Sequence, residues 1–122
     1  IARKTDMRIL IYGTDDKSVA LKTRLRKSSH YKIVGFCVFS SDNSRRILAD
    51  SRVYSFNNKV DFDLLVSKHD IQGILFSRYD SIKEEENRLL QYCKSNGVKT
   101  LIAPSISETD VNDLSYQFVR PI

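Results

Sequence analysis

Short apolar segments alternate with amphipathic ones along this sequence, and that alternation constrains the fold more than any single motif does. Met7–Gly13 is an apolar run closed by glycine, which predicts a strand buried on both faces. Tyr31–Phe39 is rich in β-branched and aromatic residues, so it predicts a second strand. Further strands are predicted at Val53–Phe56, Gly73–Phe76 and Val98–Ala103.

The segments between these strands have the spacing of amphipathic helices. Val19, Leu21 and Leu25 predict a helix of about four turns that begins near Asp16. Two further helices are predicted, a short one over Phe62, Leu65 and Val66 that ends near His69, and one that follows the capping box Ser81-x-x-Glu84 and ends at Asn96-Gly97. Strands that alternate with helices predict an α/β fold, an open parallel sheet of about five strands with helices on both faces.

Size and composition limit the classes of protein. A chain of 122 residues with 41% hydrophobic residues predicts one compact domain. Its longest apolar runs are far shorter than the roughly 20 residues of a membrane span. A net charge of +5 is modest, and aromatic residues are not interleaved with basic ones, so no nucleic-acid partner is expected. Because residue 1 is Ile and no apolar signal core follows Arg3 and Lys4, we expect the chain to be part of a longer protein.

Most side chains with reactive groups lack the spacing of a reactive site. Cys37 and Cys93 are far apart and fall on the buried sides of predicted elements, which predicts reduced structural thiols. His30 and His69 lie at predicted helix ends without metal-ligand spacing, so no metal is predicted. The pair Tyr79-x-x-x-Lys83 has the spacing of a short-chain dehydrogenase, but Tyr79 precedes its predicted helix. The basic residues of segment 22–32, with Arg45, Arg46 and Arg52, are interpreted as a solvated face or as a face turned to anionic lipid.

The loop after the first strand is the strongest candidate for a ligand site, because open parallel sheets bind ligands beyond the carboxyl ends of their strands. It contains Gly13, Thr14, Asp15, Asp16, Lys17 and Ser18, where a dinucleotide fold places G-x-G-x-x-G. Only the first glycine is kept. Asp15 and Ser18 replace the second and third, and Asp15 can itself accept the free N–H groups of the helix. Each carboxylate, at Asp15 and Asp16, would repel a pyrophosphate by about 1 kcal/mol.

The ends of two other strands complete the candidate cofactor site. Ser40 follows the second strand, where an NAD site carries an acidic residue, and the nearest acid is Asp42. Ser77 and Arg78 follow the fourth strand, and Arg78 could meet phosphate together with Lys17. Three interpretations stay open: a vestigial site, a weakened site for NAD(P) or CoA, and an unrelated use of the loop. No set of nucleophile, base and orienting residue is visible, so no catalytic residue is predicted.

The order and spacing of five segments resemble the amino-terminal Rossmann-like domain of CapD-like nucleotide-sugar dehydratases and epimerases, sometimes called a CoA-binding-like domain. The matching segments are Arg8–Gly13, Tyr31–Phe36, His69–Leu75, Cys93–Lys99 and Ala103–Ser105. The resemblance implies a domain over residues 1–117, with residues 118–122 beginning a linker to a catalytic domain. It also implies membrane helices upstream, a place at the cytoplasmic face of the bacterial inner membrane, and a role in capsule or lipopolysaccharide synthesis.

The functional expectation is therefore a non-catalytic regulatory or assembly domain of such an enzyme. One alternative is the nucleotide-binding domain of an NAD-dependent UDP-sugar dehydrogenase. Another is the cytoplasmic domain of a polyprenyl-phosphate sugar-phosphate transferase, in which a similar domain occurs. The expected partners are the catalytic domain and membrane helices of the same chain, with a nucleotide, a UDP-sugar or a second copy of the chain as further candidates.

Overall fold

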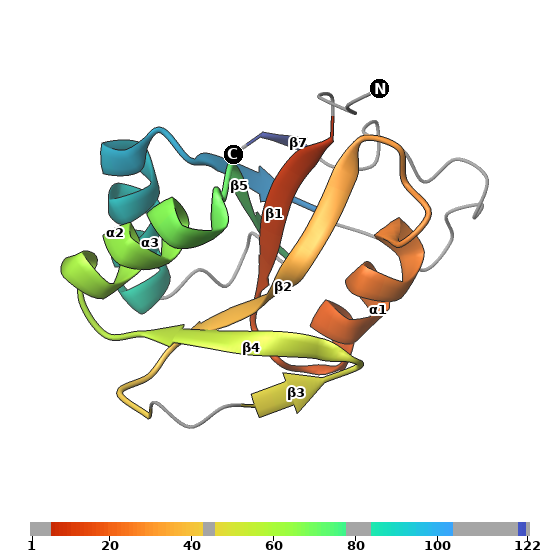
Figure 1. The fold of residues 1–122 in the computed structure, drawn as a ribbon, viewed down its shortest axis with the longest axis horizontal. Coiled ribbons are helices and arrows are strands. Elements are labelled where there is room, and N and C mark those ends of the chain that lie inside the picture. The colour runs from red at the N-terminus through yellow and green to blue at the C-terminus, as the bar shows by residue number, and fades with distance from the viewer. Residues whose placement is uncertain (1–5, 43–45, 78–83, 104–119, 122) are drawn as a thin grey trace.

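The computed structural model describes residues 6–42, 46–77, 84–103 and 120–121. Within them, a seven-stranded sheet is covered by helices on both of its faces (Figure 1). The strands are β1 (Met7–Tyr12), β2 (Tyr31–Phe39), β3 (Arg46–Leu48), β4 (Ser51–Phe56), β5 (Gly73–Phe76), β6 (Lys99–Ile102) and β7 (Arg120–Pro121). The helices are α1 (Asp16–Leu25), α2 (Lys59–His69) and α3 (Glu84–Asn96).

The order of strands across the sheet is β3-β4-β2-β1-β5-β6-β7. The five inner strands are parallel, whereas the outer strands β3 and β7 run antiparallel to β4 and β6. From β1 the chain builds outward through β2 to β4 and then returns to the other side of β1 with β5. This order is that of a Rossmann-like doubly wound fold, with its topological switch between β1 and β5. The predicted fold class is confirmed.

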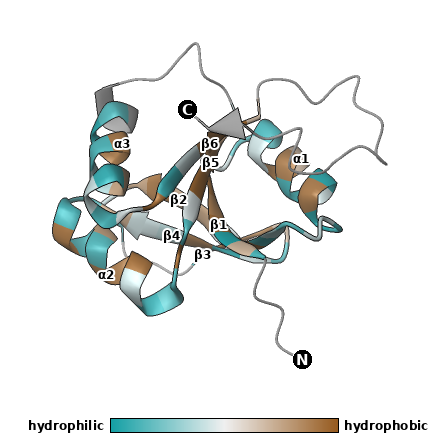
Figure 2. Ribbon diagram, turned by 90° about the horizontal axis from the view of Figure 1, so that it is seen from above, coloured by the Kyte–Doolittle hydropathy of each residue, from teal (hydrophilic) through white to brown (hydrophobic). Residues whose placement is uncertain are grey.

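Each face of the sheet is buried under its own helices. On one face Leu21 and Leu25 of α1 pack against Ile9 and Ile11 of β1. On the other face α2 and α3 supply the buried residues Phe62, Leu89 and Cys93 to a second core that includes Leu10, Ile74 and Phe76. Figure 2 shows α1 on one side of the strands and α2 with α3 on the other. Because β1 and β5 are covered on both faces, their sequences are nearly continuous apolar runs.

The predicted boundaries need correction at α1. This helix has ten residues, just under three turns rather than about four. After Leu25 no apolar residue is available to bury before Tyr31. The Ser28 hydroxyl also accepts a hydrogen bond from the His30 N–H at 3.0 Å, which favours a turn over a continued helix.

A β-hairpin at one side of the sheet was not predicted. The expected strand Val53–Phe56 begins earlier, at Ser51, and pairs with the additional strand β3. The two strands are joined through Ala49 and Asp50, both with positive φ, as a type I′ turn requires. Residues 120–121, predicted to belong to a linker, pair with β6 at the opposite side.

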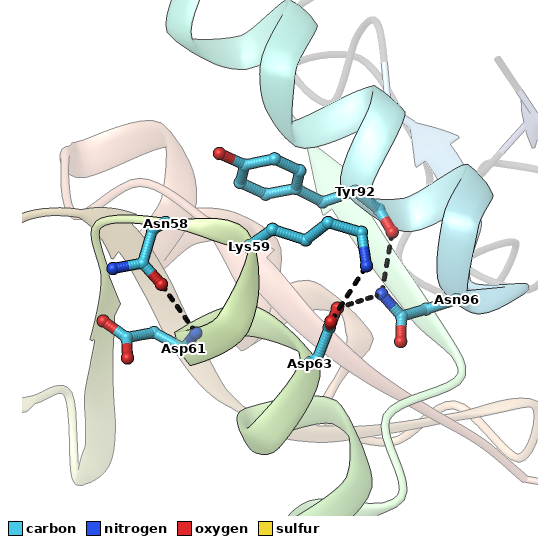
Figure 3. A network of polar contacts seen from close by, with 6 residues as sticks. All are labelled: Asn58, Lys59, Asp61, Asp63, Tyr92 and Asn96. Atoms are coloured by element: carbon cyan, nitrogen blue, oxygen red, sulfur yellow. Dashed lines mark hydrogen bonds and ion pairs between the residues drawn. The ribbon is translucent and has the colours of Figure 1, made fainter.

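A partly exposed polar network joins α2 to α3 (Figure 3). The Asp63 carboxylate accepts hydrogen bonds from Lys59 Nζ at 2.9 Å and from Asn96 Nδ2 at 2.7 Å. Asn96 Nδ2 also donates to the Tyr92 carbonyl at 2.9 Å, so the amide is held by its own helix. The network fixes the first turns of α2 against the end of α3.

Candidate functional site

The predicted site residues gather at the carboxyl end of the sheet. The loop of residues 13–18 follows β1, Ser40 follows β2 and Ser77 follows β5. Because β2, β1 and β5 are adjacent and parallel, these residues meet beside the topological switch. Arg78 lies outside the described residues, so its predicted contact with phosphate stays a prediction.

Gly13 is required by the geometry of the loop. Its φ of +109° is a conformation that residues with a side chain rarely adopt. Its N–H donates to the Cys37 carbonyl at 2.9 Å, which ties the loop to β2. A Cβ added at this position would lie 2.9 Å from Ser18 Oγ. The first glycine of the motif is therefore kept for a local structural reason, independent of any ligand.

Asp15 caps α1, as the sequence predicts. Its Oδ1 accepts a hydrogen bond from the Ser18 N–H at 2.9 Å and lies 3.0 Å from Ser18 Oγ. The fully buried Ser18 hydroxyl is also 3.3 Å from the Tyr12 carbonyl, so its single proton has two alternative acceptors. The residues that replace the second and third glycines thus bind each other. An N–H group that a dinucleotide fold offers to pyrophosphate is already bonded to Asp15.

The charges of the loop also oppose an anionic ligand. Asp15, Asp16 and Lys17 are all exposed, while Thr14 is half-buried. Two carboxylates therefore stand at the amino end of α1, where they stabilise the positive end of the helix dipole. A pyrophosphate would have to displace or neutralise them, and Lys17 offsets only one of the two charges.

The end of β2 carries hydroxyl groups rather than a carboxylate. The Ser40 N–H donates to the Phe56 carbonyl at 3.0 Å, and Ser40 Oγ accepts from the Asp42 N–H at 3.0 Å. Asp42 is exposed and lies beyond the strand. The position that bonds ribose in an NAD site is therefore occupied by a serine that holds its own turn. Ser77, after β5, is half-buried.

An aromatic residue ends each of four neighbouring parallel strands, a feature that the sequence analysis missed. These residues, which we call the aromatic end, are Tyr12, Phe39, Phe56 and Phe76. Ring centroids are 5.3 Å apart for Tyr12 and Phe76 and 4.8 Å apart for Phe39 and Phe56. Arg88 Cζ lies 4.9 Å from the centroid of Phe39. Four strands that end alike were a signal in the sequence, but only the order of strands shows that the rings are neighbours.

Both cysteines are free and buried, as predicted. Burial raises the pKa of Cys37 well above its usual value, and the nearby Cys93 raises it further. Burial also raises the pKa of Cys93 to about 12. Both thiols therefore remain protonated at neutral pH, and neither has the properties of a nucleophile.

The histidines lie apart from this loop. His69 ends α2, its ring centroid is 4.8 Å from that of Tyr54, and its carbonyl accepts from Arg8 Nε at 3.0 Å. Burial, with the charges of Lys68, Arg52 and Arg8, lowers the pKa of His69. Within the described ranges no group of His, Cys, Asp and Glu could hold a metal ion. Tyr79 and Lys83, with Ser81 of the predicted capping box, fall outside those ranges.

The helices that the structure describes include none long and apolar enough to cross a bilayer.

No protein-family model and no curated protein matches this chain. Among solved structures, it is similar to the UDP-D-quinovosamine 4-dehydrogenase from Vibrio fischeri, with a TM-score of 0.70 and 16% identity over 96% of this chain and 93% of that chain. It is also similar to RSP, a Rex-family repressor, with a TM-score of 0.59 and 12% identity over 88% of this chain and 51% of that chain. At these identities the similarity concerns the fold, and it agrees with the Rossmann-like class that the strand order defines.

Proposed function

We propose that this chain is a non-catalytic Rossmann-like module that regulates or assembles a nucleotide-sugar dehydratase or epimerase. The observation that carries the proposal is the cap of α1, in which Asp15 bonds the Ser18 N–H and approaches the Ser18 hydroxyl. These contacts use the groups that would face a pyrophosphate, and they add a negative charge there. The Rossmann-like fold is retained, but its glycine loop is closed: the groups that would bind phosphate are bonded to Asp15 instead.

The nucleotide-sugar setting is supported by two independent similarities. The five matching sequence segments resemble the amino-terminal domain of CapD-like enzymes. The similar structure from Vibrio fischeri is named for an activity on a UDP-sugar. In this proposal the parent enzyme is anchored at the cytoplasmic face of the bacterial inner membrane and serves capsule or lipopolysaccharide synthesis. A polyprenyl-phosphate sugar-phosphate transferase remains the alternative parent.

Calorimetric titration with NAD, NADP, CoA and UDP-glucose tests the closed loop. We expect no saturable heat from the unchanged chain. The double variant Asp15→Gly, Ser18→Gly restores the glycine pattern and is expected to gain measurable affinity for a dinucleotide. Asp16→Ala is the matched control, since it removes one charge from the same loop but leaves the cap intact. Saturable binding of NAD, NADP or CoA by the unchanged chain would contradict the proposal.

A second candidate is the nucleotide-binding domain of an NAD-dependent UDP-sugar dehydrogenase, which the name of the Vibrio fischeri protein favours. It requires that NAD be reduced when the chain is mixed with NAD and a UDP-sugar, followed by the absorbance of NADH. Turnover that is lost on Lys17→Gln would support this candidate and overturn the first one. No turnover, together with no binding of NAD, would exclude it.

A further inference from the structure

A pocket lies at the opposite end of the sheet from the glycine loop. Its cavity has a volume of about 350 Å³ and lies between the last turns of α1 and the beginnings of β2 and β4. Asp6, directly before β1, also lines the pocket. The pocket therefore belongs to the amino end of the sheet, where the fold class places no nucleotide.

Three cations line this pocket. Lys22 lies in the last turn of α1, Arg26 caps the end of that helix, and Lys32 is the second residue of β2. None of them lies within ion-pair distance of a carboxylate in the part of the chain that the structure describes. With Asp6 as the acidic member, the lining has an excess of two positive charges.

Asp6 provides a second, independent feature. Its Oδ1 atom is buried and has no hydrogen-bond partner among the described residues. A buried acceptor without a partner is costly, because its hydration is lost and not replaced. The lining thus combines a group that needs a hydrogen-bond donor with three groups that attract an anion. An inorganic anion without a proton to donate, such as sulfate, would satisfy the cations but not Asp6.

We propose that this pocket binds a phosphate monoester of a hydroxyl-bearing molecule, such as a sugar phosphate. The phosphate group, with a charge of about −2 at neutral pH, faces Lys22, Arg26 and Lys32 and matches the excess of positive charge. A hydroxyl of the same ligand donates to Asp6 Oδ1. The volume of the pocket suits a small ligand of this kind, since it equals that of about a dozen water molecules at ~30 Å³ each and falls at the small end of the range for ligand pockets.

The simpler explanation is that the cations only stabilise the carboxyl end of α1. Lys22 lies in the last turn of the helix and does favour its dipole. That explanation does not account for Lys32, which belongs to β2, or for the unpartnered oxygen of Asp6. A lipid phosphodiester fits less well than a monoester, because it carries one negative charge rather than two.

Calorimetric titration of the chain with glucose 1-phosphate, inorganic phosphate and glucose tests the proposal. We expect glucose 1-phosphate to bind most tightly and glucose not to bind. The double variant Arg26→Gln, Lys32→Gln is expected to weaken binding of glucose 1-phosphate by about tenfold or more. Lys27→Gln is the matched control, because Lys27 is an exposed cation beside Arg26 that does not line the pocket. The affinity of this variant for glucose 1-phosphate should stay within about twofold of that of the unchanged chain.

Asp6→Asn separates the two halves of the recognition. It removes the negative charge and replaces a charged acceptor with a weaker neutral one, so we expect inorganic phosphate to bind the variant more tightly while the preference for glucose 1-phosphate over phosphate falls. Four outcomes would overturn the proposal: no saturable binding of glucose 1-phosphate, equal binding of inorganic phosphate, equal weakening by Lys27→Gln, or cosedimentation with phosphatidylglycerol vesicles in place of sugar phosphate binding. Since none of these probes is a dinucleotide, failure here leaves the closed glycine loop untouched.

Discussion

Two glycines with positive φ differ in what surrounds them. Gly97 follows α3 with a φ of +68°, and a Cβ added there would meet no atom within 4 Å. Gly13 has a φ of +109° and a Cβ there would meet Ser18 Oγ at 2.9 Å. The first is an ordinary helix end, whereas the second combines a conformation reserved for glycine with a close approach.

Gly13→Ala is therefore expected to destabilise the protein more than Gly97→Ala does. We expect Gly97→Ala to cost about 1 kcal/mol and Gly13→Ala ~2–3 kcal/mol in the free energy of unfolding. Urea denaturation of both variants, followed by circular dichroism, measures the difference. Equal losses would mean that the approach of Ser18 to Gly13 is relieved without cost.

The buried thiols predict a simple reactivity. Because the pKa of Cys93 is raised to about 12 and that of Cys37 is raised well above its usual value, almost no thiolate exists at neutral pH. We expect iodoacetamide to leave both residues unmodified in the native protein and to modify both in denaturant, as detected by mass spectrometry. Native modification at the rate of a free thiol would contradict the burial of either residue.

At the residue scale, local chemistry was predictable and distant contacts were not. The cap by Asp15 was predicted because an N-cap acts within three residues of itself. The need for a glycine at Gly35 was not predictable. A Cβ there would lie 2.5 Å from the carbonyl oxygen of Arg52 on β4. That approach depends on which strand becomes the neighbour of β2.

At the scale of elements, α2 and α3 are coupled by a carboxylate. The pKa of the Asp63 carboxyl is lowered. The hydrogen bond from Asn96 is the largest cause, and the hydrogen bond and charge of Lys59 add to it. A group whose pKa is lower in the folded state stabilises it above the unfolded pKa, and this contribution is lost as the pH falls through the folded value. The contact between the two helices is thus expected to weaken in acid.

Asp63→Asn is expected to lower the melting temperature slightly at neutral pH and to reduce its decline between neutral and acidic pH. Asp61→Asn removes the same charge from the same helix but leaves the network intact, because the Asp61 N–H donates only to the side chain of Asn58, which caps α2. Differential scanning calorimetry over a series of pH values compares the two. If both variants reduce the pH dependence equally, the bond to Asn96 has no part in it.

The hairpin between β3 and β4 offers a stabilising change. Ala49 and Asp50 both have positive φ, which costs about 1–2 kcal/mol for a residue with a Cβ. Replacing them with Asn-Gly, the preferred pair of a type I′ turn, is expected to raise the free energy of unfolding by about 1 kcal/mol. Ser29→Gly, in a loop without positive φ, serves as the control and is expected to destabilise slightly in the same denaturation experiment.

Elements with a strong apolar period were predicted, and elements defined by pairing were not. The five parallel strands and the helices that pack on them follow from their own apolar residues. β3 has little apolar content to bury, with Ile47 70% exposed, and exists because it pairs with β4. β7 likewise depends on β6, which lies about twenty residues before it in the sequence.

At the scale of the whole molecule, one sheet is shared by two cores. Leu21 packs into the core under α1 and Leu89 into the core under α2 and α3, and both are fully buried. Because the strands between them are common to both, loss of packing on either face weakens the same sheet. The carboxyl end and the amino end of the sheet are both held in place by these shared strands.

Leu21→Ala and Leu89→Ala are each expected to cost about 2–5 kcal/mol. Both variants should unfold in a single transition with the denaturant dependence of the unchanged protein, since the cores do not unfold separately. Tyrosine fluorescence and circular dichroism would be followed in one urea titration. Two separate transitions, or a midpoint that differs between the two signals, would show that the cores are independent.

The short antiparallel strands that flank the described sheet have a consequence for the protein in concentrated solution. β3 has three residues and β7 two, and β7 contains a proline, which has no N–H to offer. A neighbouring molecule therefore finds few free backbone groups along either outer strand with which to extend the sheet. The protein is equipped to resist growth into fibrils, even though its five inner strands have the composition that amyloid favours.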